Sequence, residues 1–285
     1  MEINDASHRI IGELLTQRTG QQLTESRRWR VSSALSGLFR ELGIENVDHL
    51  ACLLERPGEQ RLATKVVEAL LNNETYFFRD QVYFAQLANH VLPDLARKRE
   101  ATKRLSIWSA GCSTGQEALS LAMIFAEQPA RWKGWKIDIL GTDISGKAIE
   151  TARNGLYTQF EIQRGISVAQ MLNFFAESKG SWQASEKIRS MTRFQQHNIL
   201  DHPPSPGRFD LVMCRNVLLY FDPPTRSTAF DRLASGTAKD GWLMLGAGET
   251  VVGQTERFEP SACGPSLYTP AVKERPFTPS QATAG

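Results

Sequence analysis

The chain has 285 residues, more than one typical domain, and 41% of them are hydrophobic, which is enough for packed cores. Its 33 basic and 31 acidic residues leave a net charge of only +2. The overall charge therefore gives no reason to expect binding to nucleic acid or to an anionic membrane. No stretch approaches the roughly 20 apolar residues of a membrane span, and residues 1–9 lack the pattern of a secretion signal, so we expect a cytoplasmic protein.

The first 75 residues predict an all-helical N-terminal domain. Apolar residues recur at helical spacing in four segments, 6–19, 25–42, 46–55 and 58–72. The second segment has an apolar side with Val31 and Leu35 and an opposite side with Trp29, Arg30 and Arg40. This basic face is either a solvated surface or a docking site for an acidic helical partner.

Residues 72–84 follow this domain and combine polar side chains with four aromatic ones. Asn73, Thr75 and Arg79 stand among them. A guanidinium among apolar rings indicates an anionic partner, and a ligand carboxylate at the seam between two domains would supply one. A helix over about 81–99 is expected next, so that residues 76–104 link the helical domain to a sheet.

Residues 105–120 predict a strand, a glycine turn and the start of a helix. The strand covers 105–110, the turn 111–115, and the helix begins at Gln116. In an open α/β sheet such a turn allows a ligand to lie close to the backbone at the carboxyl end of the strand. The spacing of Gly111 and Gly115 does not match the Gly-x-Gly-x-x-Gly pattern of a dinucleotide site.

Two other interpretations of the turn remain. The Gly-x-Ser-x-Gly letters fit a hydrolase with Ser113 as nucleophile, although the only later histidines, His197 and His202, precede Asp210 in the chain. The alternative is the nucleoside loop of an S-adenosylmethionine-dependent methyltransferase, in which an acidic residue that ends the next strand holds the ribose hydroxyls. Residues 136–141 predict that strand, and Asp143 follows it.

The rest of the chain continues the alternation of strands and helices with one interruption. Strands are expected over 192–196, 209–214 and 241–246, helices over 145–154 and 225–239, and a closing β segment over 249–269. Residues 158–190 break this rhythm and read as an insertion, and the Pro-, Thr- and Ser-rich tail 271–285 is expected to be disordered. Polar groups follow the carboxyl ends of successive strands, where α/β sheets bind ligands: Glu117, Asp143, Asn198, Arg215 and Asn216.

The four cysteines give no sign of a metal site or a disulfide framework. They are far apart and form no Cys-x-x-Cys pair, so we expect no metal and interpret Cys52, Cys112, Cys214 and Cys263 as small buried residues.

Five motifs, in chain order, resemble those of the CheR family of chemotaxis receptor glutamate O-methyltransferases, over nearly the whole chain up to about Thr269. They are Asn73-x-Thr75-x-Phe77-Phe78-Arg79, Ser109-Ala-Gly-Cys-Ser-Thr-Gly-Gln-Glu117, Thr142-Asp143-Ile144, Asn198-Ile199 and Cys214-Arg215-Asn216-Val217-x-x-Tyr220-Phe221. The resemblance implies an α/β fold: a class I S-adenosylmethionine methyltransferase (Rossmann-like) domain over 105–270. It also implies a small inserted β subdomain, about 158–190 here, and a preceding all-α domain over 1–75.

The same resemblance implies a site for S-adenosylmethionine, with S-adenosylhomocysteine as product. The implied cofactor-binding residues are Asn73, Thr75, Arg79, Glu117, Asp143, Asn198, Ile199, Arg215 and Asn216. Arg79 and Tyr220 would lie nearest the transferred methyl group and act as the catalytic residues.

This chemistry requires no proton shuttle. A glutamate side chain, with a pKa near about 4.3, is already an anion at neutral pH, so its attack on a sulfonium methyl needs no general base. The site then has to supply alignment and exclusion of water. A non-catalytic module that only binds S-adenosylmethionine remains an alternative, against which Arg79 and Tyr220 argue.

Some family members dock a C-terminal receptor peptide on the inserted subdomain through a glycine-rich loop. The corresponding segment here, 175–185, looks shorter and has one glycine, Gly180. We therefore expect no dependence on such a tether, and recognition of the cytoplasmic helical domain of methyl-accepting receptors through the basic face with Arg30 and Arg40. We also expect a monomer, without nucleic-acid binding or insertion into a membrane.

Overall fold

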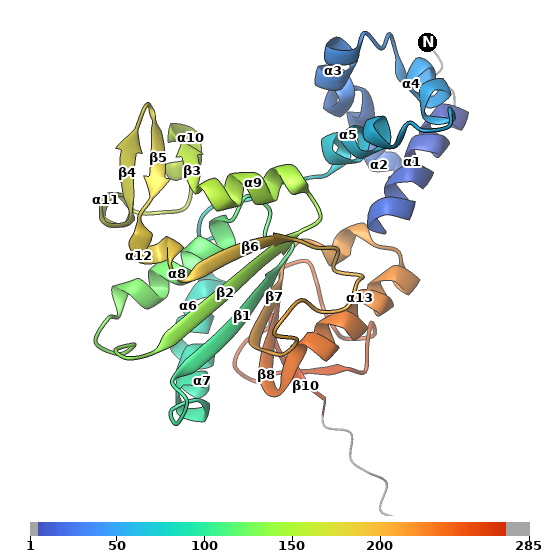
Figure 1. The fold of residues 1–285 in the computed structure, drawn as a ribbon. Coiled ribbons are helices and arrows are strands. Elements are labelled where there is room, and N and C mark those ends of the chain that lie inside the picture. Colours follow the sequence, from blue (N-terminus) through green and yellow to red (C-terminus); the bar gives the residue numbers. More distant parts are fainter. Residues whose placement is uncertain (1–4, 272–285) are drawn as a thin grey trace, which may run out of the picture.

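The computed structural model describes residues 5–271, which form a helical region followed by an α/β sheet region (Figure 1). The tail predicted to be disordered lies outside the described residues, apart from Ala271. Within residues 5–271, no helix is both long and apolar enough to cross a membrane.

The prediction of an N-terminal helical region is confirmed, and residues 5–70 form a set of helices around one core. Its elements are α1 (Asp5–Thr19), α2 (Glu25–Arg28), α3 (Arg30–Leu42), α4 (Val47–Leu54) and α5 (Gln60–Leu70). One buried cluster joins them, with members such as Leu15 in α1, Leu35 in α3, Leu50 in α4 and Val66 in α5. Burial of these apolar stripes stabilises helices that would be marginal alone.

The prediction of one helix over 25–42 is wrong in one respect, because the helix is interrupted at Trp29. The backbone of Trp29 keeps helical angles (φ −59°, ψ −24°), so the hydrogen bonding breaks locally while the chain direction is kept. The predicted faces of α3 are confirmed: Val31 and Leu35 are buried, whereas Arg30 and Arg40 are exposed.

Seven strands form the main sheet in the order β6-β2-β1-β7-β8-β10-β9. Their bounds are β1 (Arg104–Ala110), β2 (Lys136–Asp143), β6 (Thr192–Gln196), β7 (Phe209–Cys214), β8 (Thr237–Leu245), β9 (Phe258–Pro260) and β10 (Leu267–Pro270). The first five of these pair in parallel, and β9 and β10 add an antiparallel edge. The chain order reverses between β1 and β7, which is where sheets of this type bind ligands.

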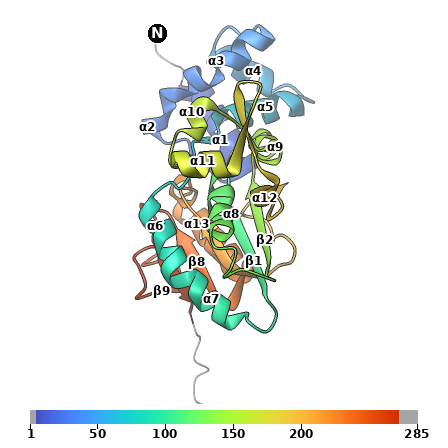
Figure 2. The same cartoon turned by 90° about the vertical axis from the view of Figure 1, so that its left-hand side faces the viewer.

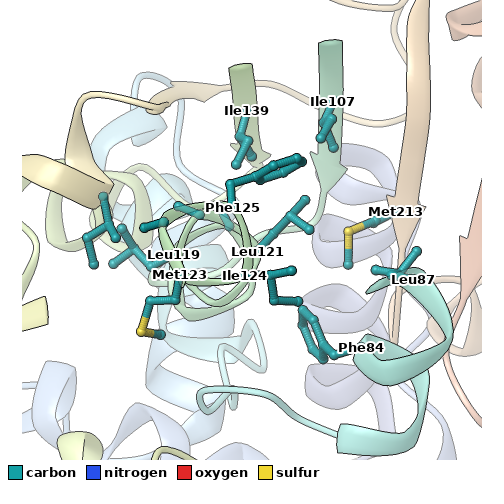
Figure 3. Packing of buried hydrophobic residues seen from close by; sticks show 14 of the residues in the cluster. Phe84, Leu87, Ile107, Leu119, Leu121, Met123, Ile124, Phe125, Ile139 and Met213 are labelled. Carbon is teal, nitrogen blue, oxygen red and sulfur yellow. The ribbon is translucent and has the colours of Figure 1, made fainter. Parts of the chain in front are cut away.

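Helices cover both faces of this sheet, and alternate residues of β1 show it. Ile107 packs with one cluster, which holds α6 (Gln81–Gln86), the π-helical turn η1 (Leu87–Val91), α7 (Leu92–Lys98) and α8 (Gln116–Glu127) (Figure 3). Trp108 packs with the other cluster, which includes residues of α13 (Pro223–Gly236). Figure 2 shows α7 and α8 on the side of the sheet nearer the viewer. The helix α9 (Gly146–Asn154) follows β2 and contacts β6.

The prediction of a small inserted β subdomain is confirmed: a separate three-stranded antiparallel sheet has the order β3-β5-β4 and begins at Leu156. Its elements are β3 (Leu156–Thr158), α10 (Gln159–Ile162), α11 (Val168–Phe174), β4 (Phe175–Ser178), β5 (Ser181–Ala184) and α12 (Glu186–Arg189). Gly165, at φ +96°, lies so close to segment 74–81 that a Cβ there would overlap the carbonyl oxygen of Phe77. The Gln81 side chain donates to the Gly165 carbonyl at 3.3 Å, so this corner anchors the insertion.

The structure corrects three further expectations. The helix over 81–99 is divided by the π-helical turn, and the helix over 225–239 ends at Gly236, where β8 begins. Cys112 and Cys214 are buried as expected, but Cys52 and Cys263 are exposed.

Candidate functional site

A cleft of about 870 Å³, open mouth included, lies between the carboxyl ends of the parallel strands and the helical region. All ten residues predicted for the site line it: Asn73, Thr75, Arg79, Glu117, Asp143, Asn198, Ile199, Arg215, Asn216 and Tyr220. The sequence did not indicate that Thr19, Gln21 and Asn72 of the helical region also line it. The helical region therefore forms one wall of the cleft.

The glycine turn between β1 and α8 is fastened to the end of β2. The backbone N–H groups of Gly111 and Cys112 both donate to the Thr142 carbonyl, at 2.7 and 2.9 Å. Gly111 has φ +77°, and a Cβ there would overlap the Val217 side chain. Only glycine allows the turn to pack this closely against Val217. Gly111, Cys112 and Ser113 of the same turn line the cleft.

Asp143 connects three segments of the cleft. Its Oδ2 accepts from the Ser113 N–H at 2.8 Å and its Oδ1 from the Ser145 N–H at 2.9 Å. Burial raises the pKa of Asp143 above its ordinary value, and the two backbone donors oppose this shift. The Ser113 hydroxyl donates to the Asn73 carbonyl at 2.7 Å rather than to a histidine, so the geometry gives no support to a serine nucleophile.

Arg215 is held in a buried charge cluster. Its Nη1 donates to Glu117 Oε2 at 3.0 Å, and its Nη2 donates to Asp80 Oδ2 at 2.8 Å and to the Arg79 carbonyl at 2.7 Å. Only 2% of the Arg215 side chain and 11% of the Glu117 side chain are exposed, so this ion pair is largely desolvated, whereas Asp80 is 33% exposed. Ser109 donates to the other oxygen of Glu117 at 2.7 Å. One guanidinium thus faces two carboxylates, and a net negative charge remains beside the cleft.

The backbone around the cleft adopts unusual conformations. Phe78 (φ 49°) and Asp80 (φ 59°) flank Arg79, and Ser113 (φ 51°) and Asn216 (φ 59°) line the cleft, all in the left-handed region. A bulky residue such as Phe78 adopts this region only where its surroundings enforce it. Its N–H donates to a buried hydroxyl at 2.9 Å, that of Ser120. The structure thereby turns the Arg79 side chain to the cleft.

Arg79 keeps its charge available. Its Nη1 donates to the Glu74 carbonyl at 3.1 Å, and its Cζ lies 5.7 Å from the Tyr76 ring centroid. Among residues 5–271 its guanidinium forms no ion pair with a carboxylate. Arg164 of the insertion lies over the same Tyr76 ring at 4.2 Å and pairs with Glu74 at 3.0 Å, which braces the Tyr76 ring from the other domain.

Glu249 organises the loop that follows β7, and no local sequence pattern indicates this role. Its Oε1 accepts from the backbone N–H groups of Val217 and Leu218 at 2.9 and 2.8 Å. Its Oε2 accepts from those of Asn216 and Gly246 at 2.8 and 2.9 Å. One carboxylate therefore satisfies four donors and fixes the loop that carries Asn216 into the cleft.

Tyr220, in the short 3₁₀ helix η2 (Leu218–Tyr220), is held by residues of the helical region. The Asn72 Nδ2 donates to its hydroxyl oxygen at 2.8 Å, and the Arg27 Cζ lies 4.6 Å from its ring centroid. The Gln22 N–H donates to its backbone carbonyl at 2.8 Å. These contacts bridge about 150 or more residues of sequence, so no local pattern reveals them.

Comparison with known proteins places these features in a family context. Residues 73–265 match the family model described as "CheR methyltransferase, SAM binding domain". The chain is 32% identical over 268 residues to a "Chemotaxis protein methyltransferase" of Vibrio parahaemolyticus, which covers 93% of this chain and 96% of the relative. It is 34% identical to "Chemotaxis protein methyltransferase 1" of Pseudomonas aeruginosa (94% and 98% covered) and 31% identical to the "Chemotaxis protein methyltransferase" of Escherichia coli (90% and 89% covered).

Proposed function

Because the chain belongs to the CheR family of chemotaxis protein methyltransferases, enzymes that methylate chemoreceptors with S-adenosylmethionine, we propose that its acceptor is a glutamate carboxylate, which becomes a methyl ester. The observation that carries this proposal is the Arg79 guanidinium, which lines the cleft and has no carboxylate partner among the described residues. An incoming carboxylate is the partner that such a group favours. The Tyr220 hydroxyl lines the same cleft and offers a second contact.

The donor set of the cleft fits S-adenosylmethionine. The glycine turn 111–113 lines the cleft, and the carboxylates of Glu117 and Asp143 are acceptors suited to ligand amino and hydroxyl groups. The excess negative charge of the Arg215 cluster suits a cationic ligand. We propose that Asn73, Thr75, Arg79, Asn198, Ile199, Arg215 and Asn216 complete this binding site.

The proposed reaction needs positioning more than acid–base chemistry. S-adenosylmethionine supplies a methyl group on a positively charged sulfur; the bond from sulfur to methyl breaks and a bond from the carboxylate oxygen to methyl forms, so that both charges are lost and no proton moves. Arg79 steers the carboxylate and Tyr220 donates a hydrogen bond to it.

We further propose that the helical region is the receptor-binding domain. Arg30 and Arg40 are exposed on α3, and an acidic helix bundle is the complementary surface. The hairpin between β4 and β5 is short, with Gly180 at its tip, which supports recognition without a receptor tail peptide. We also propose that the protein is a cytoplasmic monomer, with one domain over 1–75 and another over 105–270, joined by residues 76–104.

Transfer of labelled methyl groups to receptor-containing membranes tests this function. We expect label that is released by alkali as methanol, because a methyl ester is labile to base and an N-methyl group is not. Tyr220→Phe should reduce the transfer while S-adenosylhomocysteine still binds. Arg79→Ala should reduce the transfer and also weaken S-adenosylhomocysteine binding, because Arg79 is proposed for both roles. Label that resists alkali would contradict a carboxylate acceptor, and tight binding of a receptor-tail pentapeptide in calorimetry would contradict recognition without a tether. Cofactor binding without any turnover would indicate the non-catalytic alternative.

A further inference from the structure

We infer that Asn72 is a positioning residue that directs the hydroxyl proton of Tyr220 into the cleft; this inference rests on the proposed role of Tyr220. Asn72 follows α5, and its Nδ2 donates to the Tyr220 hydroxyl oxygen at 2.8 Å. Both residues line the cleft. The two residues are 148 positions apart in sequence, so the contact joins the helical region to the sheet region.

The argument follows from the hydrogen-bonding capacity of a phenol. The hydroxyl of Tyr220 has one proton to donate and lone pairs that accept. Because the Asn72 amide donates to the oxygen, it occupies a lone pair and leaves the proton free. Among residues 5–271 no acceptor receives that proton. The proton is therefore left for a group from outside the chain, and a substrate carboxylate, an acceptor only, matches it.

Two further contacts keep the phenol in this orientation. The Arg27 guanidinium lies over the ring, with Cζ 4.6 Å from the centroid, and fixes the ring plane. The Gln22 N–H donates to the Tyr220 carbonyl at 2.8 Å and fixes its backbone. With ring and backbone held, the hydroxyl hydrogen can still rotate about the bond between the ring and the oxygen. The Asn72 amide favours the rotamers in which this hydrogen points away from Asn72.

The inference also predicts which oxygen of the acceptor carboxylate attacks the methyl group. A carboxylate that receives the Tyr220 proton on one oxygen presents its other oxygen to the methyl group, so the hydroxyl sets the direction of attack. Loss of this direction lowers the turnover number more than the affinity for S-adenosylhomocysteine. Residues that only support the fold would change neither quantity selectively.

Substitution of Asn72 by alanine and by aspartate tests the inference in the full-length protein. Asn72→Ala removes the donor, and we expect kcat for receptor methylation to fall about fivefold to tenfold with little change in S-adenosylhomocysteine affinity. Asn72→Asp replaces the donor by an acceptor that takes the hydroxyl proton for itself. We expect it to be more damaging than Asn72→Ala. Asn173→Ala, at an exposed site in α11 of the insertion, is the matched control and should keep the wild-type rate.

The same substitutions in a Tyr220→Phe background separate the possible outcomes. If Asn72 acts through the hydroxyl, neither Asn72→Ala nor Asn72→Asp lowers the rate further once the hydroxyl is gone. Additive losses would overturn the inference, since Asn72 would then act elsewhere. Wild-type activity in Asn72→Asp would also overturn it, because capture of the hydroxyl proton by the aspartate would then have no effect on the reaction. Failure of the proposed function is distinct from these results: wild-type protein would then release no methanol at all.

Discussion

Replacement of Glu249 by glutamine should loosen the loop that carries Asn216 and Tyr220. The wild-type carboxylate accepts four backbone N–H groups at 2.8 to 2.9 Å, two on each oxygen. A glutamine has one oxygen in place of two, so its amide nitrogen must face two of these donors whichever way it is turned.

The expected cost can be estimated from those two unsatisfied donors. Each buried donor left without a partner costs about 1–3 kcal/mol. Glu249 is half-buried, so water compensates in part, and we expect the free energy of unfolding to fall by about 2–4 kcal/mol. A change of this size exceeds the effect of most surface substitutions several-fold.

Urea unfolding of the full-length protein, followed by fluorescence, measures this change. Glu256→Gln is the matched control, because it removes the same charge from an exposed side chain, and it should leave the midpoint unchanged. Initial methylation rates should fall in Glu249→Gln and persist in the control. Equal midpoints for Glu249→Gln and wild type would refute the view that this carboxylate holds the loop.

Three other outcomes are expected. Burial raises the pKa of Asp143 above its ordinary value of about 3.9. The affinity for S-adenosylhomocysteine should therefore fall as the pH drops through this raised pKa, because the protonated acid is a weaker hydrogen-bond acceptor. Calorimetry on Asp143→Asn should show weak binding that does not depend on pH in this range. Ser113→Ala should lose about 1 kcal/mol of stability with the bond to Asn73 yet retain methyl transfer, and labelling of wild type by a fluorophosphonate would speak against this assignment. Glu68, in α5, accepts from the Ser145 hydroxyl and the Gly146 N–H at 2.6 and 2.7 Å and so joins α5 to the start of α9. Glu68→Ala should therefore lower the free energy of unfolding by about 2 kcal/mol in urea titrations. An unchanged midpoint would contradict a stabilising role for this contact.

The parts of the fold that the sequence predicts well depend on local patterns. The strand β7 begins and ends where its apolar run predicts, because the run is short and bounded by polar residues. The bounds predicted for β6 are also correct, although this edge strand contains only one apolar residue, Phe194. Asp143 at the end of β2 and Glu117, in the first turn of the helix that follows β1, line one cleft because the topology brings the carboxyl ends of parallel strands together. The short strand β3 was not predicted, since it is defined by pairing with β5, more than 20 residues away.

The parts of the site that the sequence does not reveal depend on distant partners. Glu249 binds backbone N–H groups, which every residue possesses, so no letter at positions 216–218 indicates the contact. Asp80 is adjacent to a predicted residue, yet its pairing with Arg215 requires the two loops to be packed together. The break of helix at Trp29 and the π-helical turn in 87–91 shift the hydrogen-bond pattern by a residue or so, which apolar spacing does not resolve.

The corner at Gly165 gives the insertion two regions with opposite tolerance to change. A side chain at position 165 would collide with the carbonyl of Phe77, in the segment that presents Arg79. Substitution of Gly165 is therefore not tolerated. The hairpin tip at Lys179 and Gly180 is exposed and touches nothing of the cleft. The hairpin tip can therefore change in length or in charge, and acquire new binding contacts, without altering the residues that line the cleft.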